Sequence, residues 1–265
     1  MTPGVRGPQP KKRFGQHFLH DRSVVERTLK AMDPRPGQHV VEIGPGLGIL
    51  TLPLLERVGA LQTIEIDRDL IPLLWDACGH NPGLQVIQGD ALEFDFRGLA
   101  PAGGRLRLAG NLPYNISTPL LFHLLDQCDV IEDMHFLLQK EVVDRMGAAP
   151  DTADYGRLTV SLAARAEVTP LFNVPPGAFR PPPRVHSATV RVRPRPPAFT
   201  IEDTGTFDRV VKQAFSQRRK MLSNALKGVA TPAELEAAGI DPKARAETLS
   251  AEDFARLSNL LPAAV

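Results

Sequence analysis

The stretch Val41-Glu-Ile-Gly-Pro-Gly-Leu-Gly48 decides the fold of this 265-residue chain. It is a short apolar run that ends in glycines spaced G-x-G-x-G, and it is followed by Leu50, Leu54 and Leu55 at helical spacing. Glycines at the end of a strand allow a sharp turn into a helix and let a ligand approach the backbone. The stretch therefore predicts a strand, a ligand-binding loop and a helix, the first unit of an α/β sheet.

Further β-rich runs on both sides of helix-like segments extend this unit into a sheet. With the first strand, the runs cover residues 39–43, 61–66, 84–88, 105–109 and 134–138. They lack a clean polar and apolar alternation, as expected of parallel strands that are covered on both faces. Right-handed crossovers would make the sheet doubly wound. A helix over 157–165 and an antiparallel strand over 185–192 follow, so we expect the sheet to close near residue 193.

A proline-rich segment predicts the domain boundary. Eight prolines occur between Pro175 and Pro197, and such clusters stiffen loops and linkers because they remove backbone donors. We place the boundary at about residue 196. Residues 21–196 then form the α/β domain and residues 197–265, with periodic apolar positions, a small helical domain. Residues 1–20 are expected to be a flexible basic arm.

The composition excludes several classes of protein. With 43% hydrophobic and 23% charged residues, the chain is neither disordered nor fibrous. Cys78 and Cys128 lack the spacing of a zinc site or a disulfide framework, and the histidines form no metal-ligand motif, so we expect no metal. No apolar run is long enough for a membrane span. A cytoplasmic protein fits these features best.

Acidic residues at three successive strand ends predict the ligand. Glu42 precedes the glycines and would repel a pyrophosphate but attract an ammonium or a sulfonium. Glu65 ends the second strand, where an acidic side chain can accept hydrogen bonds from both ribose hydroxyls. Asp90 follows the third strand and could accept a hydrogen bond from the exocyclic amine of an adenine. The three together favour an adenosine ligand without phosphates.

The motif Asn111-Leu112-Pro113-Tyr114 follows the fourth strand and predicts the reaction. The exocyclic amine of a purine is a poor nucleophile because its lone pair is delocalised into the ring. The Asn111 side-chain oxygen and the Leu112 carbonyl could accept hydrogen bonds from its two N–H groups. Pro113 would stiffen the turn, and Tyr114 would stack on the base. The motif therefore indicates methyl transfer to an adenine amine.

Five motifs give the chain a close resemblance to the KsgA/RsmA-type family of ribosomal RNA small subunit adenine-N6,N6-dimethyltransferases. They are Glu42-Ile-Gly-Pro-Gly-Leu-Gly48, Asn111-Leu-Pro-Tyr-Asn-Ile-Ser117, Phe14-Gly-Gln-His-Phe-Leu19, Phe179-Arg-Pro-Pro-Pro-Arg184 and Phe215-Ser-Gln-Arg-Arg-Lys220. The resemblance implies a class I (Rossmann-like) α/β methyltransferase sheet with a small all-helical C-terminal domain. It also implies an enzyme of ribosome biogenesis that uses S-adenosylmethionine to dimethylate N6 of two adjacent adenosines in the 3′-terminal hairpin of 16S rRNA. We expect a monomer that binds the assembling small subunit.

Carried over by position, the resemblance implies a set of cofactor contacts, to which the arm at residues 1–20 contributes. They are His17, Leu19, Gly44, Gly46, Glu65, Asp90 and Asn111. His17 stands where the family commonly has Asn, and either side chain could donate to the methionine carboxylate. Because His can also be charged, we expect cofactor affinity to depend on pH more than in relatives.

The resemblance also implies RNA contacts. Phe179 would face Tyr114, and the target adenine would stack between the two rings. From the residues alone, a Phe buried in the core is an equal alternative. The basic RNA-binding residues would be Lys11, Lys12, Arg13, Arg180, Arg184, Arg218, Arg219 and Lys220. The net charge of +1 hides a polarised distribution. Residues 1–30 carry seven basic and two acidic side chains, and residues 180–228 carry eleven and three, which predicts a surface for RNA phosphates.

Two alternatives stay open. The chain could methylate adenine N6 in large-subunit RNA or in DNA, because all of these substrates present the same amine. It could also act mainly as a ribosome-assembly checkpoint that needs no turnover. A nicotinamide dehydrogenase is excluded by the glycine spacing and by the lack of a second nucleotide-binding half.

Overall fold

The computed structural model describes residue 11 and residues 15–263. The chain divides into two compact units. The first comprises Met1–Val143 and Thr169–Pro194, and the second comprises Asp144–Val168 and Arg195–Val265. Each unit is described by itself.

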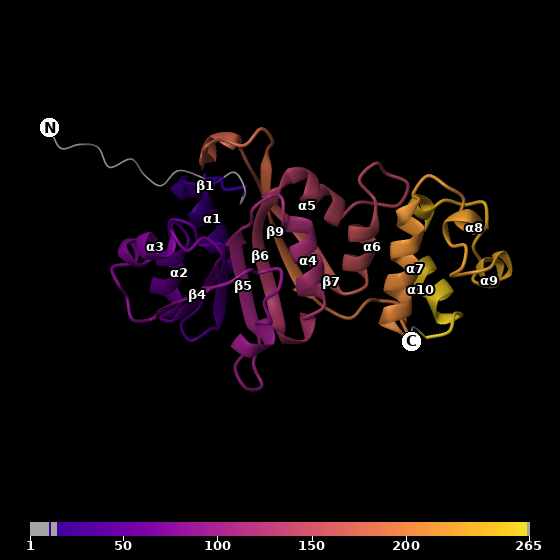
Figure 1. Ribbon diagram of the computed structural model, residues 1–265, viewed down its shortest axis with the longest axis horizontal. Coiled ribbons are helices and arrows are strands. Elements are labelled where there is room, and N and C mark those ends of the chain that lie inside the picture. The colour runs from indigo at the N-terminus through magenta and orange to yellow at the C-terminus, as the bar shows by residue number, and fades with distance from the viewer. Residues whose placement is uncertain (1–10, 12–14, 264–265) are drawn as a thin grey trace. The chain divides into compact units, whose positions relative to one another are not determined.

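The first unit is built on a seven-stranded sheet with the order β4-β3-β2-β5-β6-β9-β7 (Figure 1). Its strands are β2 (Val40–Ile43), β3 (Leu61–Glu65), β4 (Leu84–Gln88), β5 (Leu106–Asn111), β6 (Ile131–Gln139), β7 (Ala166–Val174) and β9 (Ser187–Pro194). The first five pair in parallel, and β9 pairs antiparallel with β6. The predicted parallel sheet with a late antiparallel strand is confirmed.

Strand β7 is the element that the sequence pattern did not predict. It contains Pro170, which donates no ladder hydrogen bond, and most of its residues are only partly buried. By contrast, every residue of β2 is buried. A central strand leaves a continuous apolar run in the sequence, whereas a partly covered edge strand does not.

Five helices connect the strands of the first unit. They are α1 (Arg22–Met32), α2 (Thr51–Val58), α3 (Ile71–Ala77), α4 (Ser117–Leu125) and α5 (Lys140–Met146). Helix α1 is capped by Asp21, whose side chain accepts a hydrogen bond from the Ser23 N–H. One face of α1 packs into the apolar core around Leu54, Leu55 and Leu74. The helices thus hold the carboxyl ends of the parallel strands at one edge of the sheet.

The neighbouring strands hold the carboxyl end of β5 on both sides. The carbonyl oxygen of Ile43 passes Gly110 so closely that a Cβ there would lie 2.4 Å from it, so only glycine fits. On the other side of β5, Asn111 pairs with Leu137 of β6. Asn111 therefore lies at the end of a strand that is tightly held on both sides.

A short two-stranded sheet corrects the prediction of a flexible arm over residues 1–20. Strand β1 (Phe18–Leu19) pairs antiparallel with β8 (Phe179–Arg180), and the His20 N–H donates to the Ala178 carbonyl at 2.9 Å. Residues 15–20, which we call the strap, are therefore an ordered part of the first unit. The remainder of the predicted arm, apart from Lys11, lies outside the described residues.

The second unit is helical, with α6 (Arg157–Ala163), α7 (Thr204–Ser216), α8 (Leu222–Ala225), α9 (Pro232–Ala237) and α10 (Ala251–Asn259). The single boundary expected at residue 196 does not describe this division, because residues 144–168 belong to the helical unit as well. The physical reason is packing: Tyr155 and Val160 lie in the same apolar core as Phe207 and Phe254, and the Tyr155 hydroxyl donates to the Leu249 carbonyl.

Candidate active site

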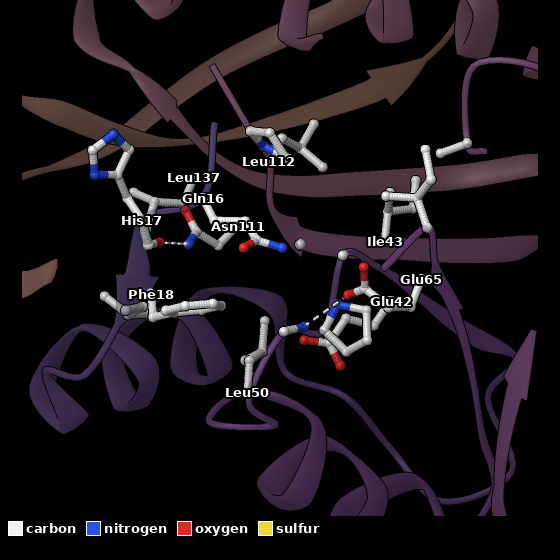
Figure 2. A pocket seen from close by; sticks show the side chains of 18 of the residues that line it. Gln16, His17, Phe18, Glu42, Ile43, Leu50, Glu65, Asn111, Leu112 and Leu137 are labelled. Carbon is white, nitrogen blue, oxygen red and sulfur yellow. Dashed lines mark hydrogen bonds between the residues drawn. The ribbon is translucent and has the colours of Figure 1, made fainter. Parts of the chain in front are cut away.

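A cavity of about 330 Å³ opens at the carboxyl ends of the parallel strands (Figure 2). Residues at the ends of β2, β3 and β5, the segment after β4 and the strap line it. Of the residues predicted to bind a cofactor, all seven line the cavity: His17, Leu19, Gly44, Gly46, Glu65, Asp90 and Asn111. The topology thus brings together side chains that are far apart in the sequence.

The glycine loop after β2 is held by a carboxylate. Gly46 has a φ of +56°, and its N–H donates to Oε2 of Glu65 at 3.2 Å. The Asp67 N–H donates to the other oxygen, Oε1, at 2.8 Å. Burial raises the pKa of Glu65 even though these bonds favour its charged form. Each carboxylate oxygen keeps a second lone pair with which it could accept a ribose hydroxyl.

Glu42 is the most strongly perturbed acid in the cavity. It is 2% exposed, and its Oε2 has no hydrogen-bond partner among the described residues. Burial, together with the nearby Glu65 carboxylate, raises the pKa of Glu42 to about 8. A buried carboxyl group without a partner is unfavourable unless a ligand completes it, and a cationic ligand would do so.

The next part of the cavity combines an acid with an apolar wall. Asp90 follows β4 and accepts the Leu92 N–H at 2.9 Å. Leu47 and Ile66 line the same cavity although they are 37% and 43% exposed. Apolar side chains left exposed beside a hydrogen-bonding carboxylate suit a flat heterocycle with an amine at its edge.

A hydrogen bond to the strap sets the orientation of the Asn111 side-chain amide. Its Nδ2 donates to the main-chain carbonyl of His17 at 3.0 Å, as the dashed line in Figure 2 shows. The opposite orientation would bring two carbonyl oxygens together, so the amide oxygen is directed away from the His17 carbonyl. No described residue donates to that oxygen, which is therefore available to accept a substrate N–H.

The contact between the strap and Asn111 uses the main chain of residue 17. The side chain of His17 does something else: Nδ1 lies 2.8 Å from the Pro181 carbonyl oxygen, and the ring stacks on Tyr114 at 5.4 Å between centroids. In Figure 2 the His17 ring lies across the cavity from the carboxylates of Glu42 and Glu65. A role of this ring in binding a carboxylate stays a prediction.

Tyr114 is held at its tip as well as on one ring face. Its hydroxyl lies 2.7 Å from Oγ of Ser187, and burial raises the pKa of the phenol. The phenol therefore stays protonated at neutral pH. Sequence reasoning missed Ser187, because a single serine at the start of a strand carries no recognisable pattern.

The strap is fastened at several points. Gly15, with a φ of +60°, passes so near the Asn111 turn that a Cβ would lie 2.7 Å from Oδ1 of Asn115. Gln16 donates to Asp67 at 3.1 Å. Outside the strap, the Lys11 ammonium contacts the same Asp67 at 2.5 Å and Asp69 at 2.7 Å. The segment thus forms one wall of the cavity.

Phe179 lies in an apolar cluster of the first unit. Its ring is 1% exposed and packs in an apolar cluster with Val24, Leu137 and Val174. It is not among the residues that line the cavity. In this structure the ring therefore lies in the core and not in the cavity lining. That the target adenine stacks between Phe179 and Tyr114 stays a prediction.

The predicted RNA-binding residues differ in their surroundings. Lys12 and Arg13 lie outside the described residues, and Lys11 is engaged by Asp67 and Asp69. In the second unit Arg218 binds Glu247 at 2.7 Å and two main-chain carbonyls. Exposed side chains remain at Arg180, Arg184, Arg219 and Lys220.

Two kinds of feature are absent from the described residues. No helix in this part of the chain is both long and apolar enough to cross a membrane. No group of three or more His, Cys, Asp or Glu side chains with metal-binding geometry occurs among residue 11 and residues 15–263.

Comparison with known proteins gives consistent results. The family described as ribosomal RNA adenine dimethylase matches residues 7–262. A protein of Xanthomonas campestris named ribosomal RNA small subunit methyltransferase A is 57% identical over 251 residues, which cover 94% of this chain and 95% of that protein. A protein of the same name from Nitrosococcus oceani is 55% identical and covers 95% of this chain and 96% of its own length.

Two solved structures resemble this chain over most of its length. The dimethyladenosine transferase from Plasmodium falciparum superposes with a TM-score of 0.77 at 26% identity and covers 91% of this chain and 96% of its own. The 23S rRNA methyltransferase ErmE gives a TM-score of 0.68 at 27% identity, with 92% and 99% covered. The chain, with its Rossmann-like methyltransferase fold, therefore belongs to the ribosomal RNA adenine dimethylase family.

Proposed function

We propose that this chain transfers methyl groups from S-adenosylmethionine to N6 of two adjacent adenosines in the 3′-terminal hairpin of 16S rRNA, during assembly of the small ribosomal subunit. The observation that carries this proposal is the Asn111-Leu-Pro-Tyr114 turn, which opens on the same cavity as the Gly44–Gly48 loop. The names of the relatives support the same substrate.

The residues of the cavity fit S-adenosylmethionine. Glu42 would face the cationic methionine part, Glu65 the ribose hydroxyls and Asp90 the adenine amine. The unpartnered Oε2 of Glu42 is the observation that favours a cation rather than a phosphate. When bound, S-adenosylmethionine supplies an electrophilic methyl group on a positively charged sulfur.

Asn111 and Leu112 would activate the nucleophile. Their oxygens would accept the two N–H groups of the adenine amine, which favours a pyramidal nitrogen whose lone pair points at the methyl carbon. Once methylated, the nitrogen would carry a positive charge. The same oxygens stabilise that charge, and the proton then leaves to solvent without a strong general base.

The second transfer differs from the first. The monomethylated amine has a single N–H, so only one of the two oxygens can accept from it. Stacking on Tyr114 then contributes a larger share of the positioning. The second methylation should therefore be more sensitive than the first to changes at Tyr114.

Recognition of the RNA would rest on stacking and on phosphate contacts. The target adenine would leave its helix to reach Tyr114. The exposed Arg180, Arg184, Arg219 and Lys220 would contact phosphates, which makes affinity fall with salt. We propose that the protein acts as a monomer in the cytoplasm, where small subunits are assembled.

Mapping the methylated nucleotides tests the proposal. Small subunits that lack the dimethyladenosines would be incubated with S-adenosylmethionine carrying a labelled methyl group, and the label located by mass spectrometry of RNA fragments. Label at two adjacent adenosines near the 3′ end of 16S rRNA is expected. Label only in large-subunit RNA, as the similarity to ErmE would suggest, or only in DNA would overturn the assignment.

Substitution of Asn111 by Ala tests the chemistry. Because it removes an acceptor aimed at developing charge, we expect the methylation rate to fall by about 10²–10³-fold. Thermal unfolding should be little changed, since the Asn111 side chain is only partly buried. If subunit maturation in cells is nevertheless restored by Asn111→Ala, the checkpoint role is favoured over the catalytic one.

A further inference from the structure

Ser187 is a wholly buried hydroxyl at the edge of the candidate active site. It is the first residue of β9, its side chain is 0% exposed, and its Oγ lies 2.7 Å from the Tyr114 hydroxyl. It does not line the cavity, so it does not touch a ligand directly. Its contact with the site runs through Tyr114.

The position of the Ser187 hydroxyl is tightly defined. Ser187 pairs with Gln139 in the β6–β9 ladder, and the Lys140 N–H donates to the carbonyl of the preceding residue, His186, at 2.9 Å. The main chain is therefore held both at Ser187 and at the residue before it. The serine therefore offers a rigid point to which a mobile side chain can be fixed.

The main chain of the Tyr114 turn is closed on itself. The Ile116 N–H donates to the Pro113 carbonyl at 3.2 Å, and the Ser117 hydroxyl donates to the same oxygen at 3.0 Å. With the backbone fixed, the freedom that remains to Tyr114 is rotation about its side-chain torsions. A hydrogen bond at the hydroxyl opposes rotation about χ1, which would carry the tip of the ring away from Ser187. The His17 ring, stacked on one face of Tyr114 at 5.4 Å between centroids, opposes rotation of the ring about χ2.

We propose that Ser187 is a positioning residue for base recognition: its hydroxyl holds the tip of the Tyr114 side chain in place, so that the ring stays where the target adenine stacks. The proposal rests on the proposed function of the site. Ser187 takes no part in bond making. Without it the ring, and the amine of a base stacked on it, would shift relative to Asn111, and a shift of about 1 Å in a reacting group is costly in rate.

A double-mutant cycle tests this coupling. The variants are Ser187→Ala, Tyr114→Phe and the two combined, assayed on undermethylated small subunits. Each single change should lower kcat by about fivefold to tenfold, the range for one lost hydrogen bond, with cofactor affinity unchanged. The combined variant should be no slower than either single one. Multiplied losses, or no loss in Ser187→Ala, would overturn the proposal.

Two further variants separate positioning from general damage. Ser187→Thr keeps the hydroxyl and should restore most of kcat. Ser258→Ala removes another buried hydroxyl, which donates to the Ala255 carbonyl in the second unit, and should leave kcat unchanged. A loss in Ser258→Ala equal to that in Ser187→Ala would show that any buried hydroxyl matters, and would count against positioning.

A readout without turnover is available because the chain has only two tyrosines. In protein labelled with ¹³C in its tyrosine rings, Ser187→Ala should shift or broaden the Tyr114 signal and leave the Tyr155 signal in place. An unmoved Tyr114 signal would show that the ring is held without Ser187.

The variant Asn111→Ala distinguishes the failure of this inference from the failure of the proposed function. If Asn111→Ala is inactive while Ser187→Ala matches the wild type, the positioning role alone is refuted. If Asn111→Ala methylates at the wild-type rate, the proposed function fails and the inference fails with it.

Discussion

The two edges of the parallel sheet treat buried polar side chains in opposite ways. At the carboxyl edge, Oε2 of Glu42 is buried without a hydrogen-bond partner. At the amino edge, Arg107 donates to both oxygens of Asp133 at 2.8 and 2.7 Å and also to Gln38 and to the Met32 carbonyl. Strands β2 and β5 pair directly and contribute to both edges. At one end of the paired strands β2 and β5, a buried polar group is left for a ligand. At the other end, buried polar groups bind one another and stabilise the fold.

The pKa values follow the same division. Burial, which outweighs the lowering effect of the Thr51 hydroxyl, raises the pKa of Glu42 to about 8, and the nearby Glu65 carboxylate adds to the rise. Burial also acts on Asp133, but hydrogen bonds and charge from His135 and Arg107 outweigh it and lower the pKa of Asp133 to about 2. Two buried carboxyl groups in one sheet are thus neutral and charged, respectively, at pH 7.

The largest effect on stability is expected from Asp133→Asn. The change leaves the Arg107 guanidinium buried without its counter-charge, so the free energy of unfolding should fall by about 3–5 kcal/mol. Urea unfolding at pH 7 measures this. Methylation per folded molecule should be unchanged, because the edge concerned is not the one that carries the cavity.

An exposed pair of the same kind provides the control for Asp133→Asn. Asp129 accepts two bonds from Arg97 at 2.9 and 3.1 Å, and both side chains are exposed. Asp129→Asn should cost less than about 1 kcal/mol. Equal losses in the two variants would mean that burial is not what distinguishes the amino edge.

Phe179→Ala tests whether a residue near the carboxyl edge can serve the fold alone. Because the ring is buried in an apolar cluster, its removal should cost at least about 3 kcal/mol of unfolding free energy. The earlier stacking prediction instead expects lost methylation in a stable protein. Phe179→Leu, which keeps most of the packing and lacks the ring, separates the two: full activity supports the core role, and inactivity with normal stability supports stacking.

Glu42→Gln should change how stability depends on pH. Since the folded pKa of Glu42, about 8, lies above its ordinary value of 4.5, the folded protein binds more protons than the unfolded chain between these values. Glu42 therefore lowers the free energy of unfolding as the pH rises from 4.5 to 8, by about 1.4 kcal/mol per pH unit. Gln does not titrate, so the Glu42→Gln variant lacks this dependence of stability on pH.

Urea unfolding of wild type and Glu42→Gln at pH 5, 6.5 and 8 measures this difference. The variant should gain stability relative to the wild type as the pH rises and should bind S-adenosylmethionine more weakly. A difference in stability that is constant across the three pH values would show that Glu42 is ionised in the folded protein at all of them.

The smallest effect is expected from His17→Asn. The contact of residue 17 with Asn111 uses the main-chain carbonyl, which the substitution keeps. Cofactor affinity should therefore change by no more than about 0.5 kcal/mol. Binding measured between pH 5.5 and 8 checks this, and a difference that grows toward low pH would show instead that the charged ring reaches the ligand.

Much of the fold and of the cavity could be predicted from local patterns. The G-x-G-x-G loop, the acids at the strand ends and the Asn111-Leu-Pro-Tyr114 turn each occupy a few neighbouring residues. Because parallel strands end at a common edge, these motifs meet once the α/β order is recognised. Strand β7 and the assignment of residues 144–168 to the helical unit were missed for one reason: each depends on packing against distant segments.

The sequence alone thus determined the class of the fold, the edge that carries the site and the chemistry of its motifs, since these follow from backbone preferences and side-chain types. The tertiary structure decided which groups hold those motifs in place. The bonds from Asn111 to His17 and from Tyr114 to Ser187 join residues 94 and 73 positions apart, and the bond from His17 to Pro181 spans 164. Nothing in a local pattern specifies such partners, because whether a buried polar group is satisfied depends on what the whole chain packs against it.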